Sequence, residues 1–186
     1  GAAQPLGASK NDDGRWNFAV FAPDATGIVL CLYCADTEEL LAELPFAGRT
    51  GEVWHLAVDG IAAGTLYGLK ANGPTAPEQG FCFEPDRLLI DPYAKQLNRA
   101  LVWNERLYQV HSHYMVPKAV LASPVFDWQN TKKPAIPREK TIIYEAHVKG
   151  MTALHPDVPA HLRGTYLGMA HPSVVRHLLE LGITTV

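Results

Sequence analysis

The sequence predicts a mainly β protein, in which an antiparallel β-sandwich is followed by the first elements of a parallel α/β domain. Two observations carry this prediction. Short apolar segments of strand length recur through residues 15–71 with turn-forming residues between them, a pattern typical of an antiparallel sandwich. Residues 140–186 instead show a strand, a helix and the start of a second strand, which is the order of a βαβ unit.

Four segments are predicted as strands of the sandwich. Residues 15–21 (RWNFAVF) alternate in polarity, which places Trp16, Phe18 and Val20 on one face. The remaining strands are predicted at residues 28–34 (IVLCLYC), 53–58 (VWHLAV) and 65–71 (TLYGLKA). Asp-Gly, Pro-Asp and Asn-Gly-Pro sequences separate these segments, and such residues favour the tight turns that join antiparallel strands.

The segment after the last of these strands changes in composition. Residues 73–91 are rich in Gly, Pro and polar residues, which indicates an ordered loop. Asp91 precedes a proline and is therefore biased away from helical dihedrals, while Pro92 can begin a short turn that ends at Leu97. Residues 117–138 contain four of the fourteen prolines, and we interpret them as an extended connector between two units.

The end of the chain has a different pattern. Residues 141–148 (TIIYEAHV) are predicted as a strand, and residues 172–181 (PSVVRHLLEL) as a helix. Pro172 suits the first helical position, and Gly182 suits the position just after the helix. A second strand is expected to begin at Ile183.

Composition and charge exclude several classes of protein. The chain has 186 residues, 47% of them hydrophobic and 19% charged, which predicts a packed core rather than disorder. The net charge of −3 is unsuited to neutralising many phosphates, so no nucleic-acid partner is expected. Basic residues are too dispersed for an anionic-membrane patch, and no apolar segment approaches the ~20 residues that cross a bilayer. No membrane partner is expected.

The three cysteines do not indicate a disulfide framework or a metal centre. Three is an odd number of cysteines, and a reducing cytoplasm is the simpler location for them. Cys31 and Cys34 lie three residues apart on a predicted strand, which sends their side chains to opposite faces. Without a second such pair a zinc site is not expected, and nothing in the sequence indicates a cofactor.

Four stretches of the sequence resemble one known family when they are taken together and in order. They are PLGA with NFAVF (residues 5–8 and 17–21), YGLKANGP with PEQGF and LLIDPYAK (residues 67–74, 77–81 and 88–95), IYEAHVKG (residues 143–150), and RGTY with LGIT (residues 163–166 and 181–184). These stretches resemble the bacterial glycogen-debranching enzymes of the isoamylase type, which belong to the α-amylase superfamily. The similarity extends over the chain from Pro5 onward.

The resemblance implies a more specific fold than the periodicity does. Residues 1–115 would form an immunoglobulin-like sandwich of the glycogen-binding-module type, and residues 116–139 a Pro-rich connector. Residues 140–186 would be the first β-α-β elements of a (β/α)8 catalytic barrel. In such barrels the catalytic groups stand at the C-terminal ends of strands. The family's catalytic aspartates and glutamate are expected beyond Val186, so this chain is expected to contain no catalytic residue and to be inactive alone.

The resemblance also implies an activity for the parent protein. It would hydrolyse α-1,6 branch linkages of glycogen or a limit dextrin with retention, through a covalent glycosyl-enzyme intermediate. The present segment would serve as a docking or substrate-positioning domain. Among the acidic residues here, only Glu145 invites a catalytic interpretation, and a structural role in the predicted strand is preferred. The alternative hypothesis is a stand-alone carbohydrate-binding or regulatory module for α-glucans, which would have no need of residues 140–186.

Three residues are candidates for contact with the saccharide: Trp54, Lys70 and Asn72. Glycogen-binding modules of this type use two tryptophans and a lysine on one surface. When this sequence is aligned with those modules, Gly68 occupies the position of their lysine, and residues near Pro74 occupy the position of one tryptophan. The usual set of sugar-binding residues is therefore missing. The apolar residues of the predicted tail would also lack most of their partners in an incomplete barrel. We therefore expect the tail to self-associate with another copy of the chain, to pack back onto the sandwich, or to be partly mobile.

Overall fold

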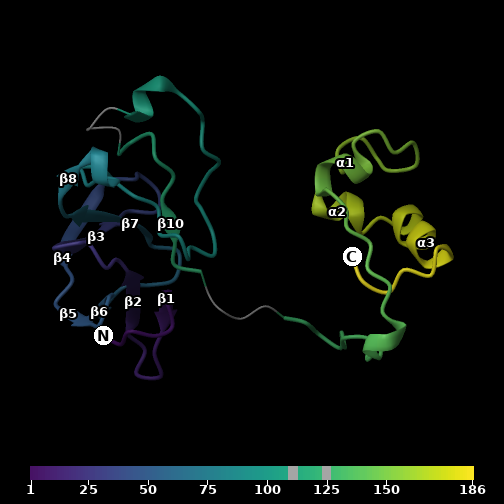
Figure 1. Cartoon of the computed structure of the whole chain (residues 1–186), viewed down its shortest axis with the longest axis horizontal. Helices are drawn as coiled ribbons and strands as arrows, with labels where there is room; N and C mark the ends of the chain where they lie inside the picture. The colour runs from purple at the N-terminus through teal and green to yellow at the C-terminus, as the bar shows by residue number, and fades with distance from the viewer. Residues whose placement is uncertain (109–112, 123–126) are drawn as a thin grey trace. The chain divides into compact units, whose positions relative to one another are not determined.

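The computed structural model describes residues 1–108, 113–122 and 127–186, and the chain divides into two units. The first unit comprises Gly1–Asp127 and the second Trp128–Val186. The first unit contains the β-sheets, and the second contains three short helices (Figure 1).

One sheet of the first unit has four antiparallel strands in the order β1-β2-β6-β5. Their bounds are β1 Gly7–Lys10, β2 Trp16–Phe21, β5 Gly48–Thr50 and β6 Val53–Val58. The β1–β2 hairpin turns at Gly14, whose φ of 85° lies in the left-handed region that glycine adopts without strain. β2 pairs with β6 in a register that sets Phe18 opposite Leu56.

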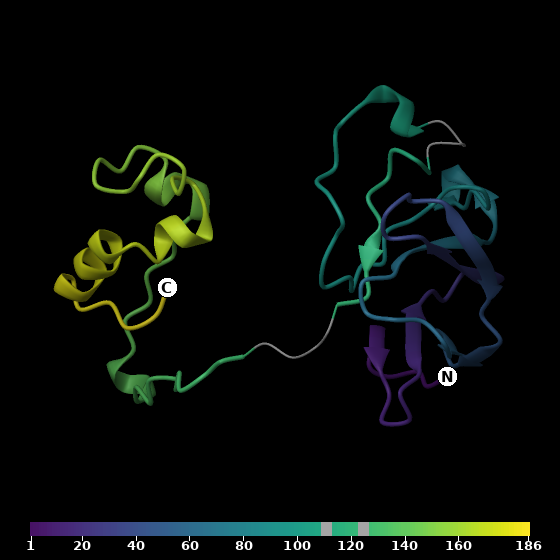
Figure 2. The ribbon, with the colours of Figure 1, turned by 180° about the vertical axis from the view of Figure 1, so that it is seen from behind.

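The other four-stranded sheet has the order β10-β7-β3-β4 and is also antiparallel. Its strands are β3 Gly27–Tyr33, β4 Leu40–Pro45, β7 Leu66–Asn72 and β10 Ala119–Val120. A small hairpin follows β7 and is formed by β8 Thr75–Ala76 and β9 Phe81–Cys82 around the 3-10 helix η1 Pro77–Gln79. A second 3-10 helix, η2, spans Glu105–Tyr108. Seen from behind, the short green arrow is β10 (Figure 2), which pairs with β7.

Alternate residues of both sheets meet in one hydrophobic core. Trp16 and Phe18 of β2 pack with Leu30 of β3 and with Tyr67 and Leu69 of β7. The rings of Phe18 and Tyr67 meet edge to face at 5.3 Å between centroids, a favourable arrangement for aromatic pairs. The predicted mainly β, antiparallel sandwich is therefore confirmed, and the four predicted strands correspond to β2, β3, β6 and β7.

The predicted domain boundaries differ in one respect from the arrangement of the strands. Residues 116–139 were expected to be a connector after a sandwich ending at residue 115. β10 lies within that range, and Ala119 pairs with Tyr67 while Val120 pairs with Leu66. Ala119 is fully buried, so hydrophobic burial holds this segment in the sheet although prolines flank it.

The second unit contains helices α1 Val148–Thr152, α2 Tyr166–Met169 and α3 Pro172–Glu180, and the 3-10 helix η3 Arg138–Lys140. The predicted helix at residues 172–181 is confirmed: His171 is its N-cap, Pro172 is in its first turn, and Gly182 has a φ of 73°. The small hydrophobic core of the second unit consists of Val158, Val174 and Leu178.

The strand predicted at residues 141–148 is not formed. In the described residues of this unit, Ile143 makes an isolated parallel bridge with Thr185, and α1 already begins at Val148. Pairing with the stretch after α3 is limited to this bridge and to adjacent backbone hydrogen bonds, such as Tyr144 N to the Thr185 carbonyl and Thr184 N to the Ile142 carbonyl, which is too short to form a ladder. The bridge is parallel, and α3 lies between its two residues in the chain. This is the order and direction of a βαβ unit, but the strands themselves are not formed.

Candidate functional site

Trp54 lies near the start of β6, on the face of its sheet that looks toward the core. Its ring is half-buried against the main core, and its Nε1 donates to the carbonyl of Ala22 at 3.2 Å. The guanidinium of Arg49 stands 5.0 Å from the ring centroid, a cation–π contact that occupies one face of the indole. A pyranose ring could stack on this side chain only after Arg49 moved away.

Lys70 projects from the opposite face of the other sheet. Its Nζ forms a 2.6 Å ion pair with Glu43 Oε1 on β4, and the Lys70 side chain is 22% exposed. The hydrogen bond with Glu43 raises the pKa of Lys70 above its ordinary value. This amine is already engaged, and a sugar hydroxyl would have to compete with a carboxylate for it.

Asn72 is the last residue of β7 and its side chain is exposed. Its backbone carbonyl accepts a hydrogen bond of 2.8 Å from the amide of Thr26. Asn72 and Lys70 are two residues apart on one strand and therefore share a face, whereas Trp54 belongs to the other sheet and turns toward the core. The structure thus brings two of the three candidates together. Whether any of them contacts a saccharide stays a prediction.

The centre of the face that carries Lys70 is covered. A Cβ added to Gly68 would lie 2.6 Å from Cδ1 of Leu88, and Leu88 packs there with Cys31, Tyr33 and Leu66 as a second apolar cluster. Burial raises the pKa of the Cys31 thiol to about 11. The position where related modules were expected to carry a lysine is therefore closed by a leucine from the loop after β9.

The same loop is fastened at two further points. The backbones of Leu89 and Leu69 exchange hydrogen bonds of 2.9 and 2.7 Å, which adds one residue pair to β7 beyond the two residues that pair with β10. Asp91 is buried, and its Oδ2 accepts 2.8 Å from the Tyr67 hydroxyl while its Oδ1 accepts 2.9 Å from the Tyr93 amide. The expected turn at Asp91–Pro92 is present, since the amide of Ala94 donates to the Asp91 carbonyl at 3.0 Å.

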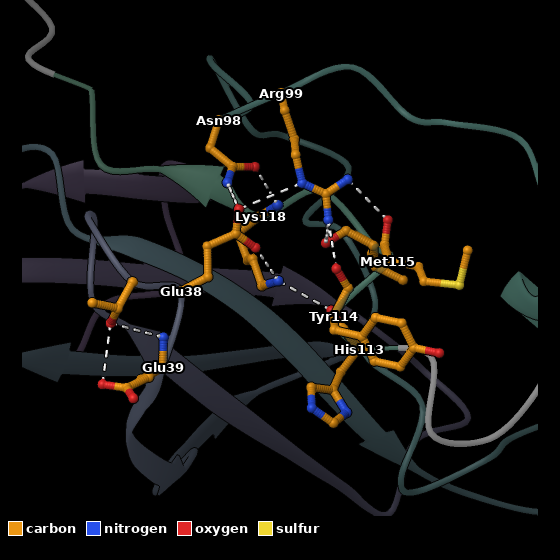
Figure 3. A network of polar contacts seen from close by, with 10 residues as sticks. Glu38, Glu39, Asn98, Arg99, His113, Tyr114, Met115 and Lys118 are labelled. Atoms are coloured by element: carbon orange, nitrogen blue, oxygen red, sulfur yellow. Dashed lines mark hydrogen bonds and ion pairs between the residues drawn. The ribbon is translucent and has the colours of Figure 1, made fainter.

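An ionic network, drawn in Figure 3, forms around Glu38 in the turn between β3 and β4, and its lysine is buried. Lys118 is 1% exposed, and its Nζ contacts Glu38 Oε2 at 2.6 Å and the carbonyl of His113 at 3.1 Å. Asn98 Nδ2 donates to Glu38 Oε1 at 2.7 Å, and Arg99 Nε approaches the same oxygen at 3.4 Å. Glu38 has a φ of 56°, a left-handed conformation that its several partners hold in place.

The network joins a turn to a strap that is remote in sequence. We define the strap as residues 96–120, of which 109–112 lie outside the described residues. The hydrogen bond from Lys118 lowers the pKa of the Glu38 carboxyl. Sequence reasoning missed this network because Glu38 lies 60 to 80 residues before the side chains that it contacts, and no local motif connects them.

An open cleft of about 640 Å³ adjoins the network. Its lining comes from Asp36, Thr37 and Glu38 of the β3–β4 turn and from Arg99, Val102, Tyr114 and Met115 of the strap. Tyr114 is 59% exposed and Val102 68% exposed. The cleft therefore combines an accessible aromatic ring with carboxylate and hydroxyl groups.

The other residues considered from the sequence are placed as follows. Glu145 is exposed. Trp16 is 3% exposed and belongs to the core, whereas Trp103 and Trp128 are 73% and 66% exposed. All three cysteines are free thiols. Within the described ranges, no group of three or more His, Cys, Asp or Glu side chains is arranged to hold a metal ion, and no helix of those ranges is long and apolar enough to cross a membrane.

The fold defines a class: two antiparallel sheets that pack around one core form a β-sandwich. Residues 5–94 match the family model of carbohydrate-binding module 48 (isoamylase N-terminal domain). The chain is 41% identical over 194 aligned residues to the glycogen debranching enzyme of Yersinia enterocolitica serotype O:8, and 39% identical over 193 residues to that of Salmonella typhi. These matches confirm the resemblance to the isoamylase-type debranching enzymes that the motifs indicated.

Each of these alignments covers 100% of the chain, and the chain spans 29% of the length of each relative. Solved structures show the same fold at lower sequence identity. A ligand-free PulA variant from Klebsiella pneumoniae has a TM-score of 0.68 at 23% identity, covering 96% of this chain and 17% of that protein. Apo pullulanase from Paenibacillus barengoltzii has a TM-score of 0.64 at 21% identity, covering 98% of this chain and 26% of that protein.

Proposed function

We propose that the chain is part of a debranching glycoside hydrolase, in which it serves as a docking and substrate-positioning region for glycogen or a limit dextrin. The observation that carries the proposal is the match of both units, over the full chain, to glycogen debranching enzymes. The stand-alone module remains the alternative. A match that extends beyond the carbohydrate-binding module at residues 5–94 through the second unit favours the hydrolase.

The whole protein would cleave α-1,6 linkages with retention, using two carboxyl groups about 5–5.5 Å apart. The parallel bridge between Ile143 and Thr185 around α3 supports the second unit as the opening of a (β/α)8 barrel after an immunoglobulin-like sandwich. The three free thiols support a reducing cytoplasm as the location.

The closed face around Gly68 supports docking over saccharide capture by the sandwich surface. Leu88 covers the centre of that face and Glu43 holds the amine of Lys70, so the face is shaped as a packed surface. The covering loop belongs to the motif by which the sequence resembles the family. Fastening this loop is therefore the structural role of the LLIDPYAK residues.

A hybrid enzyme tests the proposal. In the Yersinia enterocolitica relative, the segment matched by this chain would be replaced by residues 1–186, and release of reducing ends from glycogen limit dextrin would be measured. We expect the hybrid to debranch, the relative lacking the segment to be inactive, and the isolated chain to release nothing. A folded hybrid with no activity would count against the docking role.

A further inference from the structure

The cleft beside the Glu38 network has the chemistry of a sugar subsite. A glucosyl ring presents an apolar face and a rim of hydroxyl groups, so it is bound by an accessible aromatic ring together with a few polar groups. Tyr114 supplies an aromatic ring: the residue is 59% exposed, and the ring of His113 meets it edge to face at 5.9 Å between centroids. Asp36 and Thr37 also line the cleft. A carboxylate forms strong, charge-assisted hydrogen bonds with hydroxyl donors. The volume of about 640 Å³ lies within the ~300–1,000 Å³ usual for ligand sites.

Part of the cleft lining is held by polar contacts of Arg99. Arg99 Nη2 donates to the carbonyl of Tyr114 at 2.7 Å and Nη1 donates to that of Met115 at 3.1 Å. Figure 3 shows these contacts beside the Glu38–Lys118 ion pair, which joins the strap to the β3–β4 turn. A site whose walls are already ordered loses less conformational entropy when a ligand binds.

The tryptophan that the sequence favoured is less suited to the same task. Trp54 is half-buried, with its Nε1 bonded to Ala22 and Arg49 over its ring. The Gly68 face is closed by Leu88. Among these surfaces, the cleft presents the most accessible aromatic ring next to polar groups that a sugar can reach.

We infer that this cleft binds a glucosyl segment of an α-glucan, with Tyr114 as the stacking platform and Asp36 as the acceptor for sugar hydroxyls. The ligand class rests on the proposed function. Arg99 and Lys118 are positioning residues, because they contact backbone carbonyls of the strap and leave the sugar to Tyr114 and Asp36. The site is separate from Trp54, Lys70 and Asn72.

Affinity electrophoresis of the whole chain through glycogen gels, with maltoheptaose titration by calorimetry, tests the inference. The wild-type chain should be retarded by glycogen, and Tyr114→Ala and Asp36→Ala should each weaken binding by about tenfold. Tyr114→Phe should retain binding, because the stacking ring is kept. Tyr93→Ala is the matched control: Tyr93 is 49% exposed in the same unit and lies outside the cleft, so binding should stay within about twofold.

Two results would overturn the inference. One is a wild-type chain with unchanged mobility in glycogen and no heat on titration. The other is normal binding by Tyr114→Ala together with loss of binding in Trp54→Ala, which would assign the saccharide to the sandwich. Either result leaves the docking role untouched, since that role is measured by the activity of the hybrid enzyme. Thermal unfolding of each variant verifies that it is folded.

Discussion

The hydroxyl of Tyr67 in β7 donates a 2.8 Å hydrogen bond to the buried carboxylate of Asp91, 24 residues later in the chain. Tyr67 is 1% exposed and Asp91 3% exposed. Burial raises the pKa of the Tyr67 hydroxyl far above its ordinary value, and the negative charge of Asp91 is the second cause of this shift. The phenol therefore remains a hydrogen-bond donor at any physiological pH. This contact anchors the loop that closes the Gly68 face.

Replacing Tyr67 by phenylalanine should destabilise the first unit by about 1–3 kcal/mol, because one buried oxygen of Asp91 loses its partner. The free energy of unfolding from urea titrations checks this value. Tyr93→Phe is the control: Tyr93 is about half exposed, and its contact with Asp91 is made by the backbone amide, which the substitution leaves in place. Equal stability of Tyr67→Phe and the wild type would show that the bond is not needed.

The Glu38–Lys118 ion pair should show strong coupling in a double-mutant cycle. Glu38→Gln leaves a Lys118 ammonium that is 1% exposed without its counter-ion, which should cost about 3 kcal/mol. Combining it with Lys118→Met removes the stranded charge, so the double variant should be more stable than Glu38→Gln alone. Additive losses in the cycle would mean that the two side chains act independently.

The same pair should make stability depend on pH. The hydrogen bond from Lys118 lowers the folded-state pKa of Glu38 below its ordinary 4.5. The unfolded chain therefore binds a proton at a higher pH than the folded chain, and stability increases with pH across this interval. The contribution is complete above about pH 4.5 and is lost as the pH falls through the folded pKa. The free energy of unfolding should be measured from about pH 6 down to about pH 3. As the pH decreases over this interval, it should fall less steeply in Glu38→Gln than in the wild type.

Gly68 and Leu88 should also be coupled. Gly68→Ala places a Cβ within 2.6 Å of Leu88 Cδ1, and such overpacking costs about 1–3 kcal/mol. Leu88→Ala removes a side chain that is 3% exposed and should cost about 3 kcal/mol. The double variant should be more stable than the sum of the two losses implies, because the new methyl group enters the vacated space. Strict additivity in urea unfolding would contradict the packing described here.

We propose that the second unit associates with another copy through its apolar surface. Leu179 is 67% exposed, Leu181 53% and Val175 41% on and just after α3, and apolar surface of this kind promotes contact between molecules. The molar mass from light scattering after size exclusion should increase with protein concentration, and Leu179→Lys should reduce the increase. Leu41→Lys is the matched control, since Leu41 is 64% exposed in the first unit. A mass equal to the monomer at every concentration would refute the proposal.

The strands of the sandwich were predictable because their signals are local. Trp16 and Phe18 alternate with polar or small neighbours, and glycines mark the turns, so each strand follows from a few adjacent residues. Helix α3 was predictable for the same reason, from Pro172 at one end and Gly182 at the other. The strand at residues 141–148 was not formed, because strand propensity is realised only when neighbouring strands complete the ladder.

The sequence by itself determined the antiparallel strands, the helix after Pro172 and the resemblance to debranching enzymes, since these depend on residues close together in the chain. Only the tertiary structure decided that Leu88 closes the face over Gly68 and that Lys118 is buried against Glu38. Those contacts join residues that are distant in sequence, and their partners are chosen by three-dimensional packing and by the need to pair buried charge. No local pattern of residues encodes that choice.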